Sequence, residues 1–158
     1  MRRLHVPTMK REILYIILKP AVIDGQTKDG VFKPTEAELE DWDALKRNLM
    51  SPWVDNTGFH FIISPEGKVF ADIIPQRPGE ASPGYNADAI IIGCVALRDG
   101  DGKICQQATE TQLHVAKGVV RILKSIFPKA TFKLGNTYVM GCKAEDIYDP
   151  SKEEEEEV

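Results

Sequence analysis

Gly58-Phe59-His60-Phe61-Ile62-Ile63 is followed by the turn Ser64-Pro65-Glu66-Gly67 and by a second β-rich run, Lys68-Val69-Phe70-Ala71-Asp72-Ile73. Two short β-rich runs joined by a turn of proline and glycine are typical of a β-hairpin. The sequence therefore predicts a hairpin, which we place at the centre of a sheet. Its histidine, His60, is a first candidate for a catalytic base, because histidine titrates near neutral pH.

Two nearly continuous apolar runs predict strands that are buried on both faces of that sheet. The runs are residues 13–18 and 89–97, and unbroken apolar runs of this length are typical of central strands. We expect the first strand to stop at Lys19-Pro20, because proline cannot donate a hydrogen bond to a neighbouring strand.

Two capping boxes predict two helices. Thr35-Glu36-Ala37-Glu38 and Thr109-Glu110-Thr111-Gln112 each precede apolar residues at helical spacing, and Pro52 and Pro128 follow the expected helix ends. With a short strand at 131–134, the elements follow the order β, α, β, β, β, α, β. This order predicts one α/β domain over residues 13–149, with a mixed central β-sheet flanked by helices. Residues 1–12 are predicted to be a flexible lead-in, and residues 150–158 a disordered acidic tail.

The composition restricts the partners and the compartment. Five of the 24 acidic residues form the run 153–157, so 19 acidic residues remain against 20 basic ones, and the body of the chain shows no basic excess for nucleic-acid binding. The three cysteines, Cys94, Cys105 and Cys142, form no metal-binding spacing, and we expect them to be reduced and mostly buried. No apolar run is long enough for a signal peptide or a membrane span. We therefore expect a soluble, cytoplasmic protein without a membrane partner.

Residues 13–149 resemble the zinc-dependent N-acetylmuramoyl-L-alanine amidases of the phage-lysozyme and peptidoglycan-recognition type. The predicted hairpin is similar to the family's Gly-Tyr-His-Phe strand and the turn after it. Gly84-Tyr85-Asn86 is similar to the family's Gly-Tyr-Asn segment, which also leads into a buried strand. The second helix, followed by Phe127-Pro128-Lys129-Ala130, resembles a helix that ends in the family's Tyr-Pro-x-Ala. Several such blocks in the same order imply the amidase fold.

The resemblance also implies a zinc site, whose residues differ in this chain. The family holds zinc with two histidines and a cysteine or aspartate, and zinc activates a bound water. The matching positions are Leu18, Asn136 and Glu145, and the family's hairpin tyrosine is Phe59. We therefore expect no bound zinc and no catalytic residue, with Lys143 as a retained lysine of the site.

A ligand-binding groove is implied by the same resemblance, lined by Phe59, Ala81, Tyr85, Asn86, Asn136 and Lys143. If Phe59 takes the groove-facing place that the resemblance implies for the family's tyrosine, strand alternation turns His60 to the other side, so His60 is expected to be a hydrogen-bonded structural residue. Tyr85 and Asn86 either contact a muropeptide or shape the turn before the next strand. Cys142 is either a reactive thiol or a small buried apolar residue.

These expectations predict a catalytically inactive, amidase-like protein of a phage or bacterium. It would bind a peptidoglycan fragment or another protein through the groove. The alternative is a residual amidase that cleaves the muramoyl–L-alanine amide bond with a non-standard metal site, such as Asn136, Glu145 and Cys142. A third possibility is a structural subunit whose acidic run, 153–157, binds a basic partner.

Overall fold

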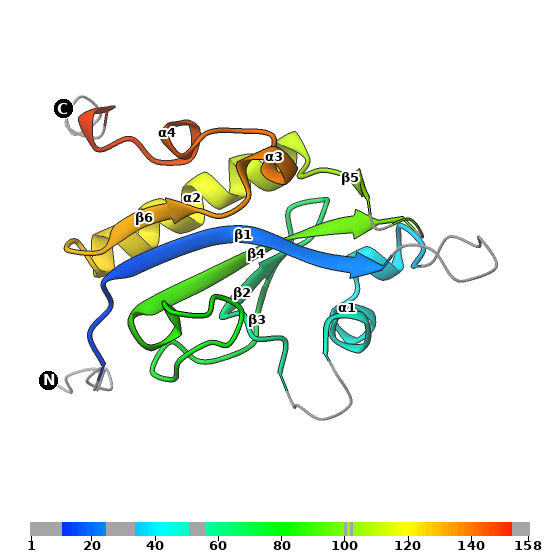
Figure 1. The fold of residues 1–158 in the computed structure, drawn as a ribbon, viewed down its shortest axis with the longest axis horizontal. Coiled ribbons are helices and arrows are strands. Elements are labelled where there is room, and N and C mark those ends of the chain that lie inside the picture. The colour runs from blue at the N-terminus through cyan, green and yellow to red at the C-terminus, as the bar shows by residue number, and fades with distance from the viewer. Residues whose placement is uncertain (1–10, 25–33, 51–55, 100, 102, 153–158) are drawn as a thin grey trace, which may run out of the picture.

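The structure, a computed structural model, describes residues 11–24, 34–50, 56–99, 101 and 103–152. These residues form a mixed sheet of six strands (Figure 1). The strands are β1 (Tyr15–Asp24), β2 (Phe61–Ile63), β3 (Val69–Ala71), β4 (Ala89–Arg98), β5 (Ile104–Gln106) and β6 (Thr131–Leu134). Their order is β3-β2-β4-β1-β6, and β5 pairs with β4. The expected α/β fold with a mixed central sheet is confirmed.

The two predicted buried strands form the centre of the sheet. β1 and β4 pair in parallel along their whole length, from Tyr15 opposite Ala89 to Asp24 opposite Arg98. The predicted hairpin is confirmed as the antiparallel pair β2 and β3. Its expected central position is wrong, because β3 lies at the edge of the sheet and only β2 contacts β4.

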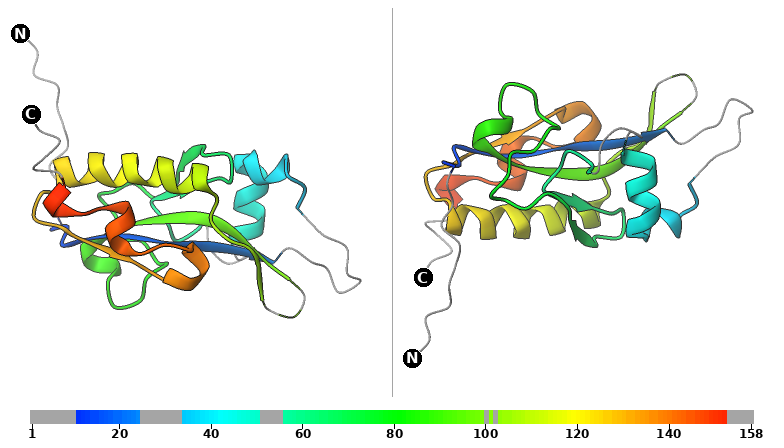
Figure 2. Two further views of the ribbon diagram at one scale, coloured as in Figure 1. Left: turned by 90° about the horizontal axis from the view of Figure 1, so that it is seen from above. Right: turned by 90° about the horizontal axis from the view of Figure 1, so that it is seen from below.

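Helices cover both faces of this sheet. The α2 face is covered by α2 (Glu110–Ile126), α3 (Thr137–Met140) and α4 (Ala144–Ile147), which lie above β1 in Figure 1. The opposite face, which we call the α1 face, packs against α1 (Trp42–Leu49) and the 3-10 helix η1 (Glu38–Glu40). Figure 2 shows α1 near the C-terminal ends of β1 and β4. A second 3-10 helix, η2 (Asn86–Asp88), directly precedes β4.

Both predicted capping boxes are present. Thr109 and Gln112 cap α2 reciprocally, with N–H to side-chain oxygen distances of 3.0 and 2.8 Å. Thr35 and Glu38 form the same pair, but they open η1 rather than one continuous helix. The backbone becomes extended at Asp41, whose carboxylate accepts the N–H of Ala44 at 3.0 Å and starts α1. Strand β5 and helices α3 and α4 are further elements that the sequence did not predict.

The expected end of the first strand at Lys19-Pro20 is wrong, because β1 continues to Asp24. The carbonyl of Leu18 accepts the N–H of Gly135 on the β6 side. Residues two apart in a strand direct their backbone groups to the same side, so the nitrogen of Pro20 also faces that side. β6 pairs only as far as Leu18, so Pro20 removes no hydrogen bond between strands.

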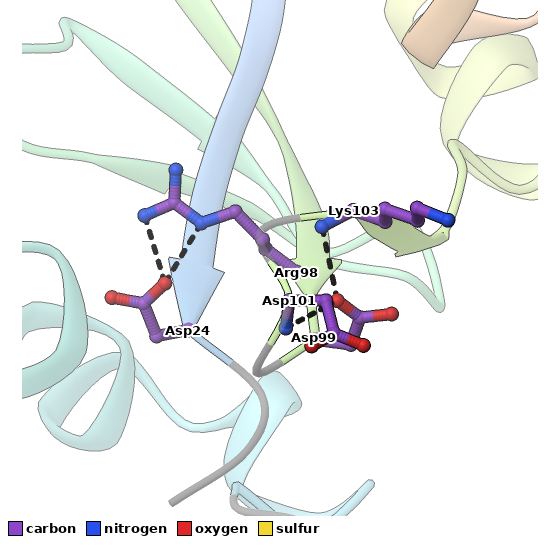
Figure 3. Close-up of polar contacts among 5 residues, drawn as sticks. All are labelled: Asp24, Arg98, Asp99, Asp101 and Lys103. Carbon is purple, nitrogen blue, oxygen red and sulfur yellow. Dashed lines mark hydrogen bonds and ion pairs between the residues drawn. The ribbon is translucent and has the colours of Figure 1, made fainter. Parts of the chain in front are cut away.

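Polar contacts connect the C-terminal ends of β1 and β4 (Figure 3). Arg98 Nη2 lies 2.8 Å from Asp24 Oδ1, across the last register pair of β1 and β4. Asp99 Oδ1 accepts the N–H groups of Asp101 and Lys103 at 2.9 and 3.0 Å, which shapes the turn into β5. The ion pair is largely exposed, so it contributes little to the free energy of unfolding.

Part of the predicted lead-in and tail lies outside the described residues, namely 1–10 and 153–158. Residues 150–152, which the sequence assigns to the tail, form a helical turn. Cys94 is buried, Cys142 is half-buried, and both are free thiols; nothing is described of the Cys105 side chain. In the part of the chain that the structure describes, no helix is long and apolar enough to cross a membrane.

A buried network around His60 ties the segment before β1 to the loop before β4. His60 is fully buried; its Nδ1 accepts the N–H of Ile91 at 3.0 Å, and its Nε2 lies 2.8 Å from the carbonyl of Arg77. A carbonyl only accepts, so Nε2 carries the proton and the ring is neutral. Arg11 lies 3.1 Å from Nε2 and donates to the carbonyls of Pro75, Ala87 and Ala89. His60 is therefore the hydrogen-bonded structural residue that was expected.

The free energy of unfolding should fall as the pH drops below 6.5 because of His60. Burial lowers the pKa of its imidazole, and the Arg11 cation lowers it further. Below pH 6.5 the unfolded chain therefore binds a proton that the folded chain does not bind. The free energy of unfolding then falls by up to about 1.4 kcal/mol per pH unit. Denaturant unfolding between pH 7 and pH 5 measures this slope. His60→Gln should flatten it, and His114→Gln, on an exposed position, should not; an unchanged slope in His60→Gln would contradict the assignment.

Gly93 of β4 is required because the ring of Phe59 lies against it. A Cβ at Gly93 would lie 2.8 Å from a ring carbon of Phe59 and 2.9 Å from Ala21 Cβ. Gly93→Ala should therefore reduce the free energy of unfolding by about 1–3 kcal/mol. Gly118→Ala, in an open position of α2, is the control and should raise it by up to about 1 kcal/mol. Equal stability of Gly93→Ala and wild type in denaturant unfolding would disprove the close packing.

Candidate functional site

A pocket of about 530 Å³ lies beside the C-terminal half of β1, where β6 has ended. We call it the β1 pocket. It brings together three of the predicted groove positions, Phe59, Ala81 and Asn136. Its full lining comes from β1, the segment before β2, the loop after β3 and the segment after β6: Lys19, Pro20, Val22, Thr57, Phe59, Ala81, Gly135 and Asn136.

The turn after β6 forms one wall of this pocket. A Cβ at Gly135 would lie 3.0 Å from Lys19 Cβ, so a glycine allows the two chains to approach closely. Asn136 follows with a φ of 56°, in the left-handed region that asparagine tolerates. Its Oδ1 accepts the N–H of Val139 at 3.1 Å and caps α3. Asn136 therefore has a structural role, and its Nδ2 remains as a hydrogen-bond donor for a ligand.

The opposite wall is fixed by backbone hydrogen bonds. The carbonyl of Gly58 accepts the N–H groups of Glu80 and Ala81 at 2.9 and 3.1 Å. Thr57 donates its N–H and its hydroxyl to Asp72 at 2.6 and 2.7 Å. Phe59, between these anchors, is only 6% exposed and lines the pocket with an apolar ring.

Lys19 is the charged side chain of the pocket lining, and the sequence prediction missed it. The side chain is half-buried, and its ammonium donates a short hydrogen bond to the carbonyl of Ala81. Burial lowers the pKa of this ammonium. Among the described residues, no carboxylate forms an ion pair with it. Lys19 thus places a positive charge in a pocket whose other lining residues are uncharged.

Leu18, the position that the resemblance matches to the first zinc ligand, does not line the β1 pocket, whereas the next residue, Lys19, does. Leu18 is fully buried in the core of the α2 face, together with Ile16 and Ile92. Alternation along β1 turns Lys19 to the other face, where Ile17 and Ala21 pack. Lys19, a polar side chain that directly follows an apolar run, is the sequence signal for this orientation.

The other predicted site residues do not line the β1 pocket. Glu145 lies in α4 and lines a separate pocket of about 460 Å³ with Lys117 and Arg121 of α2. Lys143 is exposed, and its N–H is accepted by Asp146 at 2.9 Å. Cys142 packs against the core of the α2 face, and burial raises the pKa of its thiol, which disfavours the reactive thiolate.

The residues present at the β1 pocket do not fit a zinc ion. Zinc sites use imidazole, thiolate or carboxylate ligands, and the pocket lining offers an ammonium, a hydroxyl and an amide instead. Over the described parts of the chain, no three histidine, cysteine or acidic side chains lie close enough to hold a metal. The set Asn136, Glu145 and Cys142, suggested for a non-standard site, is not brought together at this pocket.

An aromatic patch lies further along the α1 face, towards the start of β1. The Tyr85 ring, 38% exposed, packs edge-on against Tyr15 with centroids 5.1 Å apart. Lys133 Nζ lies 5.5 and 5.6 Å from the two ring centroids. Tyr15 precedes Lys19 by four residues, so the patch is about 13 Å from the β1 pocket along the strand. Asn86 accepts the N–H of Ser82 at 2.9 Å and shapes the turn.

Comparison with known sequences gives one partial match. No protein-family model matches the chain. The endolysin of Enterobacteria phage K11 is 32% identical over 78 residues, which are 49% of this chain and 51% of the endolysin. The chain thus matches about half the length of this curated relative.

Three solved structures illustrate the similarity of the fold. The endolysin N-acetylmuramoyl-L-alanine amidase LysCS of Clostridium intestinale gives a TM-score of 0.51 at 15% identity, covering 94% of this chain and 85% of that one. PGRP-Hd of Alvinella pompejana gives 0.54 at 13%, covering 86% and 80%. AmpDh3 of Pseudomonas aeruginosa, in complex with an anhydromuramic pentapeptide, gives 0.51 at 16%, covering 82% and 51%. The resemblance found in the sequence is thus confirmed, and the chain has the fold of N-acetylmuramoyl-L-alanine amidases and peptidoglycan recognition proteins.

Proposed function

We propose that this chain binds a peptidoglycan fragment along the α1 face and does not hydrolyse it. The observation that carries the proposal is the lining of the β1 pocket, where Lys19, Phe59 and Asn136 stand together. AmpDh3, a protein of the same fold, was solved with an anhydromuramic pentapeptide, which supports a ligand of this kind. Fold similarity alone would not assign the ligand, so the chemistry of the pocket has to support it.

The pocket lining argues against hydrolysis of the amide bond. A zinc hydrolase needs a metal-bound water, and the Lys19 ammonium repels a divalent cation in the place where one would bind. Phe59 has no hydroxyl to donate to a developing oxyanion, and the Thr57 hydroxyl already donates to Asp72. Lys19 can attract negative charge, but none of these three side chains supplies the metal-bound water that a zinc hydrolase needs.

The same surface has the features of a binding site for a glycopeptide. The β1 pocket combines apolar walls with a few polar donors, as small-molecule sites do. The exposed ring of Tyr85 offers an apolar face of the kind on which a sugar ring can stack. Lys19 and Lys133 supply positive charge for the carboxylates of a stem peptide.

Sedimentation with insoluble peptidoglycan tests this function. Wild type should co-sediment and should release no stem peptide on prolonged incubation. Tyr85→Ala should weaken binding about fivefold, which corresponds to the loss of about 1 kcal/mol of aromatic contact. Ile126→Ala, an exposed apolar residue of α2, is the matched control and should bind like wild type. Wild type that stays in the supernatant would refute the binding, and released stem peptides would refute the inactivity.

Elemental analysis of dialysed protein tests the interpretation of the metal position. Wild type should carry no stoichiometric zinc. Lys19→His with Asn136→His should gain zinc affinity, because it replaces an ammonium by two imidazoles at one pocket. Leu18→His with Asn136→His should gain none and should lose about 2–5 kcal/mol of stability, since Leu18 is fully buried in the core. Zinc in wild type, or in the Leu18 variant, would show that the assignment of the pocket is wrong.

A further inference from the structure

We propose that the β1 pocket is a carboxylate site, in which Lys19 Nζ and Asn136 Nδ2 hold one carboxylate of the ligand's stem peptide. This inference rests on the proposed function, because it names the group of the peptidoglycan fragment that the pocket recognises. Of the positions that the resemblance matches to zinc ligands, Asn136 lines this pocket, and Leu18 and Glu145 do not.

The first argument is the unbalanced charge of Lys19. Its ammonium is half-buried and donates to the neutral carbonyl of Ala81, and no described carboxylate pairs with it. A partly buried charge without a counter-ion is destabilising, and it is relieved by an anion that supplies the missing partner. The lowered pKa of the Lys19 ammonium agrees with this cost of burial. A bound carboxylate would raise that pKa again.

The second argument is the geometry around the ammonium. Lys19 is held from both sides, by the close approach of Gly135 at its Cβ and by the Ala81 carbonyl at its Nζ. Asn136 follows Gly135 directly, and its Oδ1 is occupied by the N–H of Val139. The Nδ2 hydrogens of the same amide are donors that the side chain can offer to a ligand. An ammonium and an amide nitrogen in one pocket select a hydrogen-bond acceptor, and the positive charge selects an anion.

The third argument is the apolar environment of the two donors. Pro20, Val22, Phe59 and Ala81 give the pocket mostly apolar walls. Apolar walls lower the local dielectric constant and strengthen a charge-assisted hydrogen bond relative to water. One ammonium and one amide match the two oxygens of a carboxylate. A phosphate dianion carries more charge and more oxygens than this small donor set can satisfy.

Isothermal titration calorimetry tests the site with two matched probes. The first is a muramyl tetrapeptide with free carboxylates, and the second is the same compound with every carboxylate converted to a carboxamide. Wild type should bind the first probe at least tenfold more tightly, as expected for the loss of a charge-assisted hydrogen bond. Lys19→Met should bind both probes equally, and Lys19→Arg should restore part of the preference. Lys117→Met, on the α2 face, should keep the full preference.

The outcomes separate this inference from the proposed function. If wild type and Lys19→Met bind both probes with equal affinity, peptidoglycan binding stands and the carboxylate site is refuted. If wild type binds neither probe, the proposed function fails, and the pocket is tested alone by titrating N-acetylalanine and its amide into labelled protein. NMR shifts at Lys19, Ala81 and Asn136 with the acid only, lost in Lys19→Met, would then support the carboxylate site. The absence of such shifts would overturn it. If Lys19→Met does not fold, the comparison of the two probes on wild type decides.

Discussion

The parallel pairing of β1 with β4 is the constraint on which the rest of the structure depends. Because the two strands pair along their whole length and are buried between two layers, each residue of β1 has a defined face. Leu18 belongs to the core under α2, and Lys19 belongs to the β1 pocket. A shift of one residue would exchange the two, burying an ammonium in the core and exposing a leucine in the pocket. Burying an unpaired charge costs several kcal/mol, so the register and the charge of the pocket are fixed together.

The pocket itself follows from the unequal lengths of neighbouring strands. β6 pairs with β1 only as far as Leu18, and the chain turns away at Gly135, which leaves the remainder of β1 without a neighbour on that side. The other wall depends on the network around His60. That network holds the residues before β2, and the Gly58 carbonyl in turn holds Ala81, which is the acceptor for Lys19. The β1 pocket is thus supported by a buried histidine that does not line it.

The parts of this arrangement that could be predicted are those with local signals. The apolar runs and the capping boxes indicated the two central strands and helix α2, whereas the grouping of Phe59, Ala81 and Asn136 was implied by the family resemblance and not by a local signal. The continuation of β1 through Pro20 could not be predicted, because a proline breaks a strand only where a neighbouring strand needs its N–H. The position of Glu145 away from the β1 pocket could not be predicted, because it depends on the packing of α4 against α2, for which the sequence has no local signal. His60 was assigned correctly, although the alternation argument does not hold: the bend at His60 sends Phe59 and Phe61 to opposite faces.

A zinc site both attracts electron-rich groups and activates a water, and an ammonium in place of a metal supplies only the attraction. In the family that this chain resembles, a zinc dication with two neutral histidines and one thiolate or carboxylate carries a net charge of about +1. The Lys19 ammonium of the β1 pocket carries the same net charge, so it would exert a similar attraction for electron-rich groups. An ammonium has no open coordination position and cannot acidify a water as zinc does, so it would not supply the chemistry of a zinc hydrolase. Its directed N–H donors also favour a full negative charge over the weak dipole of an amide carbonyl. Under the proposed function, recognition would therefore shift from the bond that an amidase cuts to the carboxylates of the same ligand.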